Sequence, residues 1–179
     1  MKTTKILIAG FGGQGILFTG KAIAYTGLKA DMEVSWLPSY GPEMRGGTAN
    51  CSVTLSDTPI GSPIVDKPDV LIAMNLPSLE KYFNETEKGG AIIYDSSLIA
   101  TCGKREDVSI AGIPATKLAS DNGLEGLANM IILGLAIKMT NVLTLDQIKA
   151  SLAEMIPPKR AAMLEKNVKA IELGYNYIG

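Results

Sequence analysis

The stretch KILIAGFGGQGI at residues 5–16 decides the fold. Residues 5–9 form a short apolar run that is typical of a buried strand, and a glycine ends it. From there to about Leu28, apolar residues recur at helical spacing, and residues 32–37 form a second apolar strand that Pro38 ends. Strand, glycine-rich turn, helix and strand in this order predict one βαβ unit of a parallel sheet.

The rest of the chain continues the alternation of strands and helices. Residues 60–65, which lie among prolines and a glycine, predict an irregular edge. The pattern predicts strands at 48–56, 69–74, 91–94 and 109–113, and helices at 77–83, 124–139, 145–155 and 159–173, the last two with Thr144 as N-cap and Gly174 as C-cap. We therefore predict one domain over residues 1–179: a three-layer α/β/α fold with a mostly parallel, Rossmann-like central sheet and a helical C-terminal third.

Composition excludes several classes of function. Lys plus Arg number 17 and Asp plus Glu 18, with no strongly basic segment, so we expect no nucleic-acid partner and no membrane partner. The chain has no histidine, which excludes histidine-dependent triads and histidine-ligated zinc within it. Cys51 and Cys102 are too few for an iron–sulfur cluster or an all-cysteine zinc site. With no targeting segment evident, we expect a cytoplasmic protein with reduced, buried thiols.

The sharpest motif is the glycine-rich turn after the first strand. Its members Gly10, Gly12, Gly13, Gln14 and Gly15 match G-x-G-x-x-G, and backbone amides at a helix N-terminus favour an anionic group. An NAD site also needs an acidic residue at the end of the next strand, and the sequence WLPS at 36–39 has none. Two alternatives to NAD stay open: a purely structural turn, and a site for another phosphate or for a neighbouring cofactor.

A second segment rich in glycine and proline, residues 38–48, follows the second strand and predicts a loop. In a parallel sheet the carboxyl ends of the strands meet at one edge, which we call the carboxyl edge, so this loop lies at the same edge as the first glycine-rich turn. Arg45 is suited to grip a carboxylate or a phosphate with two hydrogen bonds, although a surface loop without function is the alternative. Asn75 follows the third core strand at this edge, as a ligand contact or as a turn residue. The cofactor-binding candidates of this segment are Ser39, Tyr40, Gly41, Pro42, Glu43, Arg45, Gly46 and Gly47. We expect no catalytic and no metal-binding residue in this chain.

Together these motifs resemble the gamma subunit, or gamma-type domain, of the 2-oxoacid:ferredoxin oxidoreductases. The resemblance covers nearly the whole chain. It rests on GFGGQG at 10–15, WLPSYGPEMRGGTANCSV at 36–53, IGSP at 60–63, DVLIAMNLPSLEKY at 69–82, IPATKLA at 113–119 and the apolar helix around Asn129 and Gly134. Tryptophan before LPSYGPEMRGGTANC is more similar to the 2-oxoglutarate and branched-chain types than to the pyruvate type.

The resemblance implies a division of labour. Thiamine diphosphate and a 4Fe-4S cluster belong to companion alpha and beta subunits, with a delta subunit as a further candidate, and this chain alone binds no cofactor and has no activity. The complex decarboxylates a 2-oxoacid, passes electrons to ferredoxin and transfers the acyl group to coenzyme A, which the gamma domain helps to receive. Carried over by position, the residues of both glycine-rich motifs are the candidate contacts.

We expect 2-oxoglutarate as the substrate and succinyl-CoA as the product. A 2-oxoisovalerate (branched-chain) enzyme and an indolepyruvate enzyme remain alternatives within the same family. Two hypotheses come from other classes: a stand-alone dinucleotide-dependent oxidoreductase, and an assembly module whose glycine loops only shape a subunit interface.

Overall fold

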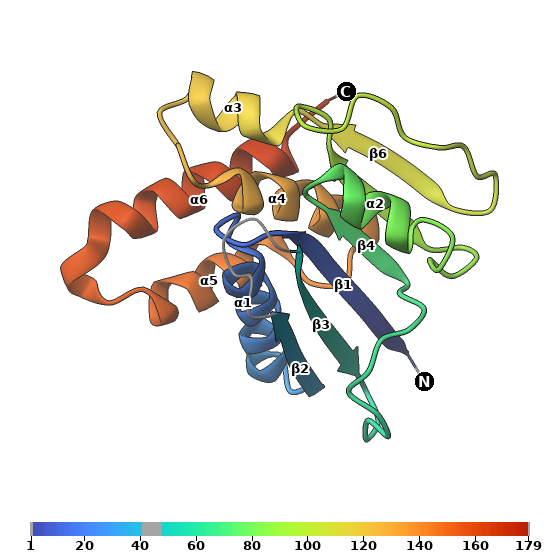
Figure 1. Ribbon diagram of the computed structural model, residues 1–179. Helices are drawn as coiled ribbons and strands as arrows, with labels where there is room; N and C mark the ends of the chain where they lie inside the picture. Colours follow the sequence, from blue (N-terminus) through green and yellow to red (C-terminus); the bar gives the residue numbers. More distant parts are fainter. Residues whose placement is uncertain (1, 41–47, 179) are drawn as a thin grey trace.

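The computed structural model describes residues 2–40 and 48–178, and within these residues a six-stranded sheet forms the centre (Figure 1). The strand order is β2-β3-β1-β4-β5-β6. The strands are β1 (Thr3–Phe11), β2 (Glu33–Tyr40), β3 (Thr48–Ser56), β4 (Val70–Ala73), β5 (Ala91–Asp95) and β6 (Ser109–Ile113). β1, β4, β5 and β6 pair in parallel, and β3 is antiparallel to both of its neighbours. The mostly parallel sheet is thus confirmed.

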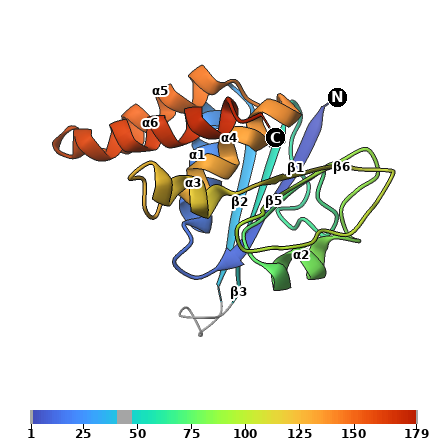
Figure 2. The same ribbon diagram turned by 90° about the horizontal axis from the view of Figure 1, so that it is seen from above.

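The helices cover the sheet unequally. They are α1 (Ile16–Lys29), α2 (Leu76–Tyr82), α3 (Ala115–Asp121), α4 (Ala128–Thr140), α5 (Leu145–Met155) and α6 (Ala161–Tyr175), with a 3-10 turn at Pro158–Arg160. Figure 2 shows α2 on one side of the sheet and the other helices on the opposite side. The predicted three layers are confirmed, and the helical C-terminal third supplies most of the thicker layer.

The central strand β1 explains why one short apolar run decides the fold. Successive side chains of a strand point to opposite faces, so a strand that is covered on both sides must be apolar throughout. Ile6 and Ile8 belong to the larger core, which α1 and α4 also line, whereas Leu7 belongs to a smaller core beneath α2. All three side chains are almost completely buried.

The predicted βαβ unit needs one correction. β2 runs in the direction of β1, but β3 lies between them and is antiparallel to both. β2 also continues beyond Leu37, because Pro38 lies on the outermost strand of the sheet, where an absent backbone N–H can be tolerated. Ser39 and Tyr40 therefore belong to a strand and not, as we predicted, to a loop.

The prediction of Gly174 as a C-cap is also wrong, since α6 runs on to Tyr175. A Cβ atom at Gly174 would overlap the carbonyl oxygen of Ile131 in α4, and one at Gly134 would overlap that of Ile171 in α6. These two glycines let the backbones of α4 and α6 touch. Glycine at the end of an apolar helical pattern thus marks a helix crossing here, not a helix end.

Two further helices differ from the prediction: one begins later than expected, and the other was not expected. α4 begins at Ala128 rather than 124, after a turn in which Gly126 has a φ of 82°. α3 was not predicted at all, because only seven residues form it and Pro114 precedes it.

Residues 57–69 contain no strand, which confirms the irregular course expected at 60–65. No helix among the described residues is long and apolar enough to cross a membrane.

Candidate functional site

The carboxyl end of β1 and the carboxyl end of β2 lie at the same edge of the sheet. Phe11 is level with Thr48 at the start of β3, and Ala49 pairs with Gly10 on one side and with Tyr40 on the other. This register confirms that both glycine-rich segments leave one edge. Of the second segment, Gly41, Pro42, Glu43, Arg45, Gly46 and Gly47 lie outside the described residues.

Gln14 braces the first glycine turn from within. Its side-chain Oε1 accepts a hydrogen bond from the Phe11 N–H (2.6 Å), and its Nε2 donates to the carbonyl oxygen of Met74 (3.0 Å) at the end of β4. A Cβ atom at Gly10 would lie 2.6 Å from the same Oε1, so a larger residue there would displace the Gln14 amide. Both ends of the Gln14 amide are therefore engaged within the chain, and the side chain positions the turn.

Asn129 braces the other end of the turn. Gly15 is the N-cap residue of α1 with a φ of 75°, and a Cβ atom on it would come within 2.5 Å of Asn129 Nδ2. That nitrogen donates to the carbonyl oxygen of Gly15 (3.3 Å) and to Thr19 Oγ1 (3.1 Å). Our site prediction omitted Asn129. The signal was available, because a buried amide in an almost wholly apolar helix needs a partner.

Between the two braces the backbone amides stay available. Among the described residues, no hydrogen bond is formed by the N–H groups of Gly12, Gly13 or Gly15. No side chain in the described part of the chain caps α1, and the first turn of α1 has no acidic residue. Gly13 has a φ of 97° and open space where a Cβ atom would lie. Free amides at an uncapped helix N-terminus fit an anionic group such as a phosphate or a carboxylate.

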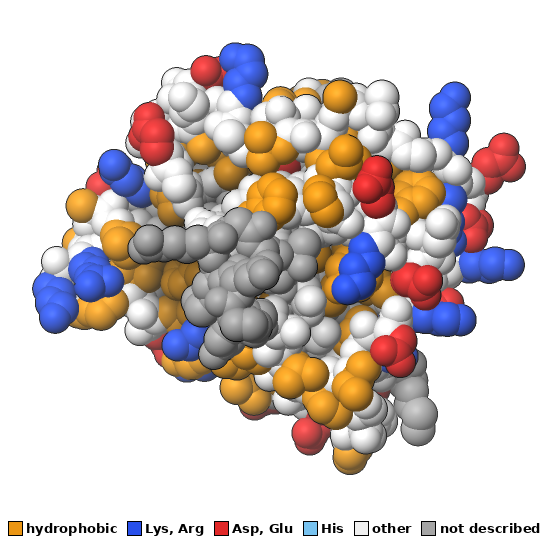
Figure 3. Space-filling model, viewed as in Figure 1, with side chains coloured by type: hydrophobic (Ala, Val, Ile, Leu, Met, Phe, Trp, Pro, Cys, Tyr) orange, Lys and Arg blue, Asp and Glu red, His pale blue; other side chains and the backbone are white. Residues whose placement is uncertain are grey.

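A mainly apolar cavity of about 330 Å³ opens beside this turn. Its walls come from the turn, from the end of β4, from α3 and from the segment that leads into α4; they are Gly13, Gln14, Met74, Leu98, Thr116, Ala119, Ser120, Glu125, Gly126 and Ala128. On this side of the molecule, hydrophobic side chains gather around the end of β1 and the start of α2 (Figure 3). The site therefore places free backbone amides beside a mainly apolar cavity.

Asp95, which sequence reasoning also missed, fixes the wall formed by α3. It is fully buried at the end of β5. Its Oδ1 accepts from the Ser97 N–H (2.9 Å), and its Oδ2 accepts from the N–H (3.1 Å) and the hydroxyl (2.5 Å) of Thr116. A buried carboxylate must find such donors. Its place directly after an apolar strand was the signal for a role at the carboxyl edge.

Two other predicted candidates, Ser39 and Asn75, do not line this cavity. Ser39 is exposed and lines a separate groove of about 540 Å³ on the α2 side of the sheet, together with Leu37 and Asn50. Asn75 is buried and caps α2, because its Oδ1 accepts from the Ser78 N–H (2.8 Å). Asn75 Nδ2 has no partner among the described residues. The ligand contacts suggested for both remain predictions.

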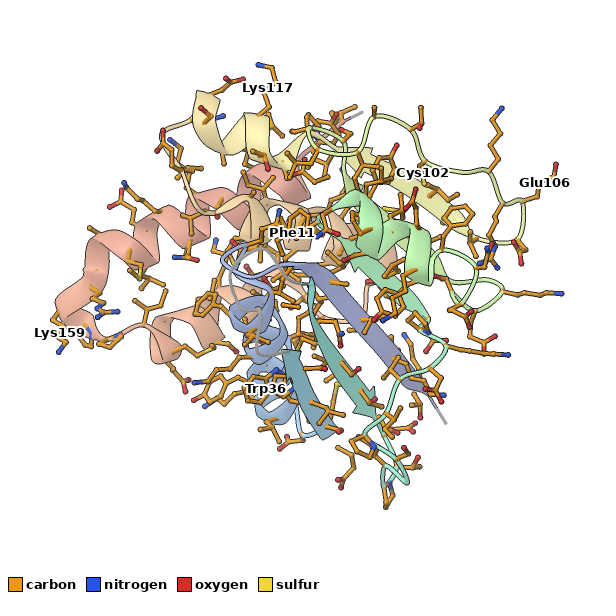
Figure 4. The ribbon with its side chains drawn as sticks, in the orientation of Figure 1. Phe11, Trp36, Cys102, Glu106, Lys117 and Lys159 are labelled. Atoms are coloured by element: carbon orange, nitrogen blue, oxygen red, sulfur yellow. The ribbon has the colours of Figure 1, made fainter. Side chains whose placement is uncertain are left out.

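The cysteines are placed for packing. Cys51 Sγ is buried and accepts a hydrogen bond from Trp36 Nε1 (2.9 Å), and burial raises the pKa of this thiol to about 11. Burial also raises the pKa of Cys102. Figure 4 shows Phe11 at the glycine turn, with Trp36 and Cys102 well away from it. A thiol with a raised pKa is a weaker nucleophile at neutral pH, so these shifts favour a packing role for both cysteines.

Comparison with known proteins identifies relatives of this chain. The family model for pyruvate ferredoxin/flavodoxin oxidoreductase matches residues 5–177. The ketoisovalerate oxidoreductase subunit VorA of Methanothermobacter marburgensis is 40% identical over 138 residues, which are 77% of this chain and 29% of that protein. The 2-oxoglutarate synthase subunit KorC of Methanocaldococcus jannaschii is 34% identical over 174 residues, which are 96% of this chain and 91% of that protein.

A solved structure agrees with these relatives. The 2-oxoglutarate:ferredoxin oxidoreductase of Magnetococcus marinus, with 2-oxoglutarate, coenzyme A and succinyl-CoA bound, superposes with a TM-score of 0.88 at 26% identity, covering 98% of this chain and 31% of that one. The chain thus spans about three tenths of the VorA and M. marinus polypeptides, and nearly all of KorC. By its sequence along almost its full length, the chain belongs to the pyruvate ferredoxin/flavodoxin oxidoreductase family.

Proposed function

We propose that this chain is the gamma subunit of a coenzyme A-acylating 2-oxoglutarate:ferredoxin oxidoreductase, and that its carboxyl edge stabilises anionic groups at the centre of the complex. The observation that carries the site is the set of free Gly12, Gly13 and Gly15 amides at the uncapped start of α1. The KorC relative, which this chain matches over almost its whole length, supports the 2-oxoglutarate type.

The chain's own residues bind and orient. The amides of Gly12 and Gly13 would donate to a phosphate or carboxylate oxygen, and the N-terminal dipole of α1 adds to the attraction. Gln14 and Asn129 hold these amides in place, because each ties one end of the turn to a neighbouring element. The cavity beside Gly13 accommodates an uncharged part of the same ligand.

The reactive groups would come from the companions. In the assembled enzyme, decarboxylation would depend on thiamine diphosphate, electron transfer to ferredoxin on a 4Fe-4S cluster, and acyl transfer on coenzyme A. The alpha and beta subunits, with a delta subunit as a further candidate, would hold these groups and contact ferredoxin. Cys51 and Cys102 are both free thiols, which supports a cytoplasmic complex.

Reconstitution tests the proposal. We expect the isolated chain to be inactive, and the complex with its companion subunits to reduce ferredoxin when 2-oxoglutarate and coenzyme A are both supplied. The matched control is the same companions without this chain. Full 2-oxoglutarate-dependent activity in that control, or activity of the isolated chain, would contradict the proposal.

A branched-chain enzyme is the second candidate, because the VorA relative has the higher identity, 40% against 34% for KorC. The same reconstituted complex separates the two when 2-oxoglutarate, 2-oxoisovalerate and indolepyruvate are compared by kcat/KM. A preference of more than tenfold for 2-oxoisovalerate would assign the branched-chain type. Tight NAD(H) binding by the isolated chain in a calorimetric titration would instead favour a dinucleotide-dependent enzyme.

A further inference from the structure

The groove on the α2 side of the sheet is a second concave site, apart from the cavity beside the glycine turn. Its volume is about 540 Å³, and the two hollows share no lining residue. Sites for small molecules have volumes of this order. The floor of the groove comes from three adjacent strands: Leu7 of β1, Leu37 and Ser39 of β2, and Asn50 and Ser52 of β3.

The register of the strands brings the polar groups of the floor together. Ser52 is level with Leu7 on one side and with Leu37 on the other, and Asn50 is level with Ser39. Side chains that are level on adjacent strands lie about 5 Å apart, and those two positions apart on one strand lie about 7 Å apart. Two hydroxyls and an amide therefore form one compact group with a leucine on either side.

The hydroxyl of Ser52 is the most informative group of this floor. Ser52 is only 7% exposed and lines the groove, yet its side chain forms no hydrogen bond among the described residues. Ser56, on the same face of β3, instead shares a hydrogen bond with the Thr3 hydroxyl (2.8 Å) and accepts one from the Thr58 N–H (3.1 Å). Because a buried hydroxyl needs a partner, the Ser52 hydroxyl is available to a group that enters the groove.

Polar side chains toward water are ordinary on a sheet face that no helix covers. α2 packs against β1 and β4, and Figure 1 shows no helix in front of β2 and β3 on this side. Ser52 differs from an ordinary surface residue because the walls of the groove bury it. The fold thus encloses a polar floor without supplying the hydrogen bonds that this floor can make.

The walls of the groove restrict the charge of a ligand. Asp66 stands on one wall, and Lys81, Tyr82 and Glu85 stand on the other. Lys81 Nζ lies 5.0 Å from the centre of the Tyr82 ring. Two carboxylates against one ammonium group disfavour an anion, and their oxygens are suited to accept hydrogen bonds from hydroxyls such as those of a ribose.

We propose that this groove binds the vicinal diol of an uncharged molecule, either a free sugar or the ribose of a nucleoside. The Ser52 hydroxyl and the Asn50 amide each donate and accept, as adjacent hydroxyls of a ligand require. The carboxylates of Asp66 and Glu85 accept from the same ligand, while Tyr82 and the two leucines of the floor pack against its C–H groups. A phosphate on the ligand weakens binding, since it adds an anion beside these carboxylates.

Nuclear magnetic resonance titrations of the full chain test the proposal with three probes: ribose, adenosine and ribose 5-phosphate. We expect ribose and adenosine to shift the amide signals of residues 37–39, 50–52 and 81–85 with a Kd in the millimolar range or below. Ribose 5-phosphate should bind at least fivefold more weakly than ribose. Tighter binding of adenosine than of ribose would assign the nucleoside, and equal binding would assign the free sugar.

Three results of these titrations would overturn the inference. They are the absence of saturable shifts with both ribose and adenosine, shifts confined to the glycine turn, and binding of ribose 5-phosphate as tight as that of ribose. None of them bears on the proposed function, because the groove and the cavity beside the glycine turn have no lining residue in common.

A matched pair of variants separates ligand binding from folding. Ser52→Ala removes the hydroxyl without a partner, so it should raise the Kd for the tighter of the two neutral probes at least fivefold and leave the midpoint of urea unfolding unchanged. Ser56→Ala removes a hydroxyl that is bonded within the chain, so it should lower that midpoint and change the Kd less than twofold. An unchanged Kd in Ser52→Ala, or a loss of stability equal to that of Ser56→Ala, would contradict the site.

Discussion

Gly13 and Gly174 are glycines for opposite reasons. At Gly13 the φ angle is 97° and no atom lies within 4 Å of where a Cβ would be, whereas at Gly174 a Cβ would overlap the backbone of Ile131. The first glycine keeps the backbone open to the outside, and the second lets two helices touch. The same residue type therefore marks the part of the molecule that meets other molecules and the part that is packed most tightly.

This contrast extends to polar side chains. At the carboxyl edge, Gln14, Asn129 and Asp95 use their hydrogen bonds to hold backbone in place around the cavity. In the helical layer the close contact of α4 and α6 depends on glycine and on apolar side chains. The α4–α6 crossing is therefore set by close backbone packing, whereas the buried polar groups of the carboxyl edge hold backbone in position.

The packed region should show the largest change in stability. We expect Gly174→Ala to lower the free energy of unfolding by about 3 kcal/mol, because α6 must move away from the carbonyl oxygen of Ile131. Urea unfolding monitored by circular dichroism measures this change. The matched control is Gly61→Ala, where no neighbour lies within 4 Å, and a similar loss in both variants would contradict the close crossing.

Replacing the buried Asp95 carboxylate at the carboxyl edge should give the second-largest loss of stability. Asp95→Asn leaves one oxygen where two now accept, and it turns an amide N–H toward the donors of Ser97 or Thr116. We expect a loss of about 2 kcal/mol in the free energy of unfolding and faster hydrogen exchange at the start of α3. Asp66→Asn, on the surface, should change stability by less than about 0.5 kcal/mol.

Alkaline pH should test the packed side of β3. The pKa of Cys51 is raised from 9.0 to about 11 in the folded chain, so between these values only the unfolded chain releases the proton. The free energy of unfolding therefore falls as pH rises above 9, by about 1.4 kcal/mol at pH 10. Urea unfolding measured from pH 8 to 10 should show this fall. In Cys51→Ala, the free energy of unfolding should lack this decrease with pH.

The sequence predicted those features that a local pattern determines. β1 and the glycine turn follow from one apolar run and from the conformational freedom of glycine, and Thr144 is the N-cap of α5 as predicted. The shared edge of the two glycine-rich segments followed from strand direction alone. These features need no knowledge of distant contacts.

Features that depend on distant contacts were not predictable in this way. The antiparallel insertion of β3 between β1 and β2 is a choice of sheet partners, and no local pattern encodes it. Gly174 was misread because its reason lies in α4, more than 40 residues earlier. The hydrogen bond from Gln14 to the carbonyl oxygen of Met74 joins residues 60 positions apart at the ends of the neighbouring strands β1 and β4, so no local pattern shows it, and the predicted ligand contact of Gln14 stays a prediction.

Of the test variants in this comparison, Gly13→Ala should lower stability least and enzyme activity most. Gly13→Ala puts a side chain at a φ of 97° and fills the space beside the free amides, and we expect about 1 kcal/mol of destabilisation. Gly89→Ala is the matched control, because its φ is 79°, its surroundings are equally open and it lies at the opposite edge, next to Asp107.

Both variants should therefore lose similar stability and still bind the companion subunits. Only Gly13→Ala should lower kcat/KM of the reconstituted complex, by at least tenfold, since its methyl group blocks the approach of an anion to the amides. Equal turnover in the two complexes would mean that the open glycine turn is structural. Loss of complex formation by Gly13→Ala alone would instead make the turn part of a subunit interface, without a role in holding the ligand.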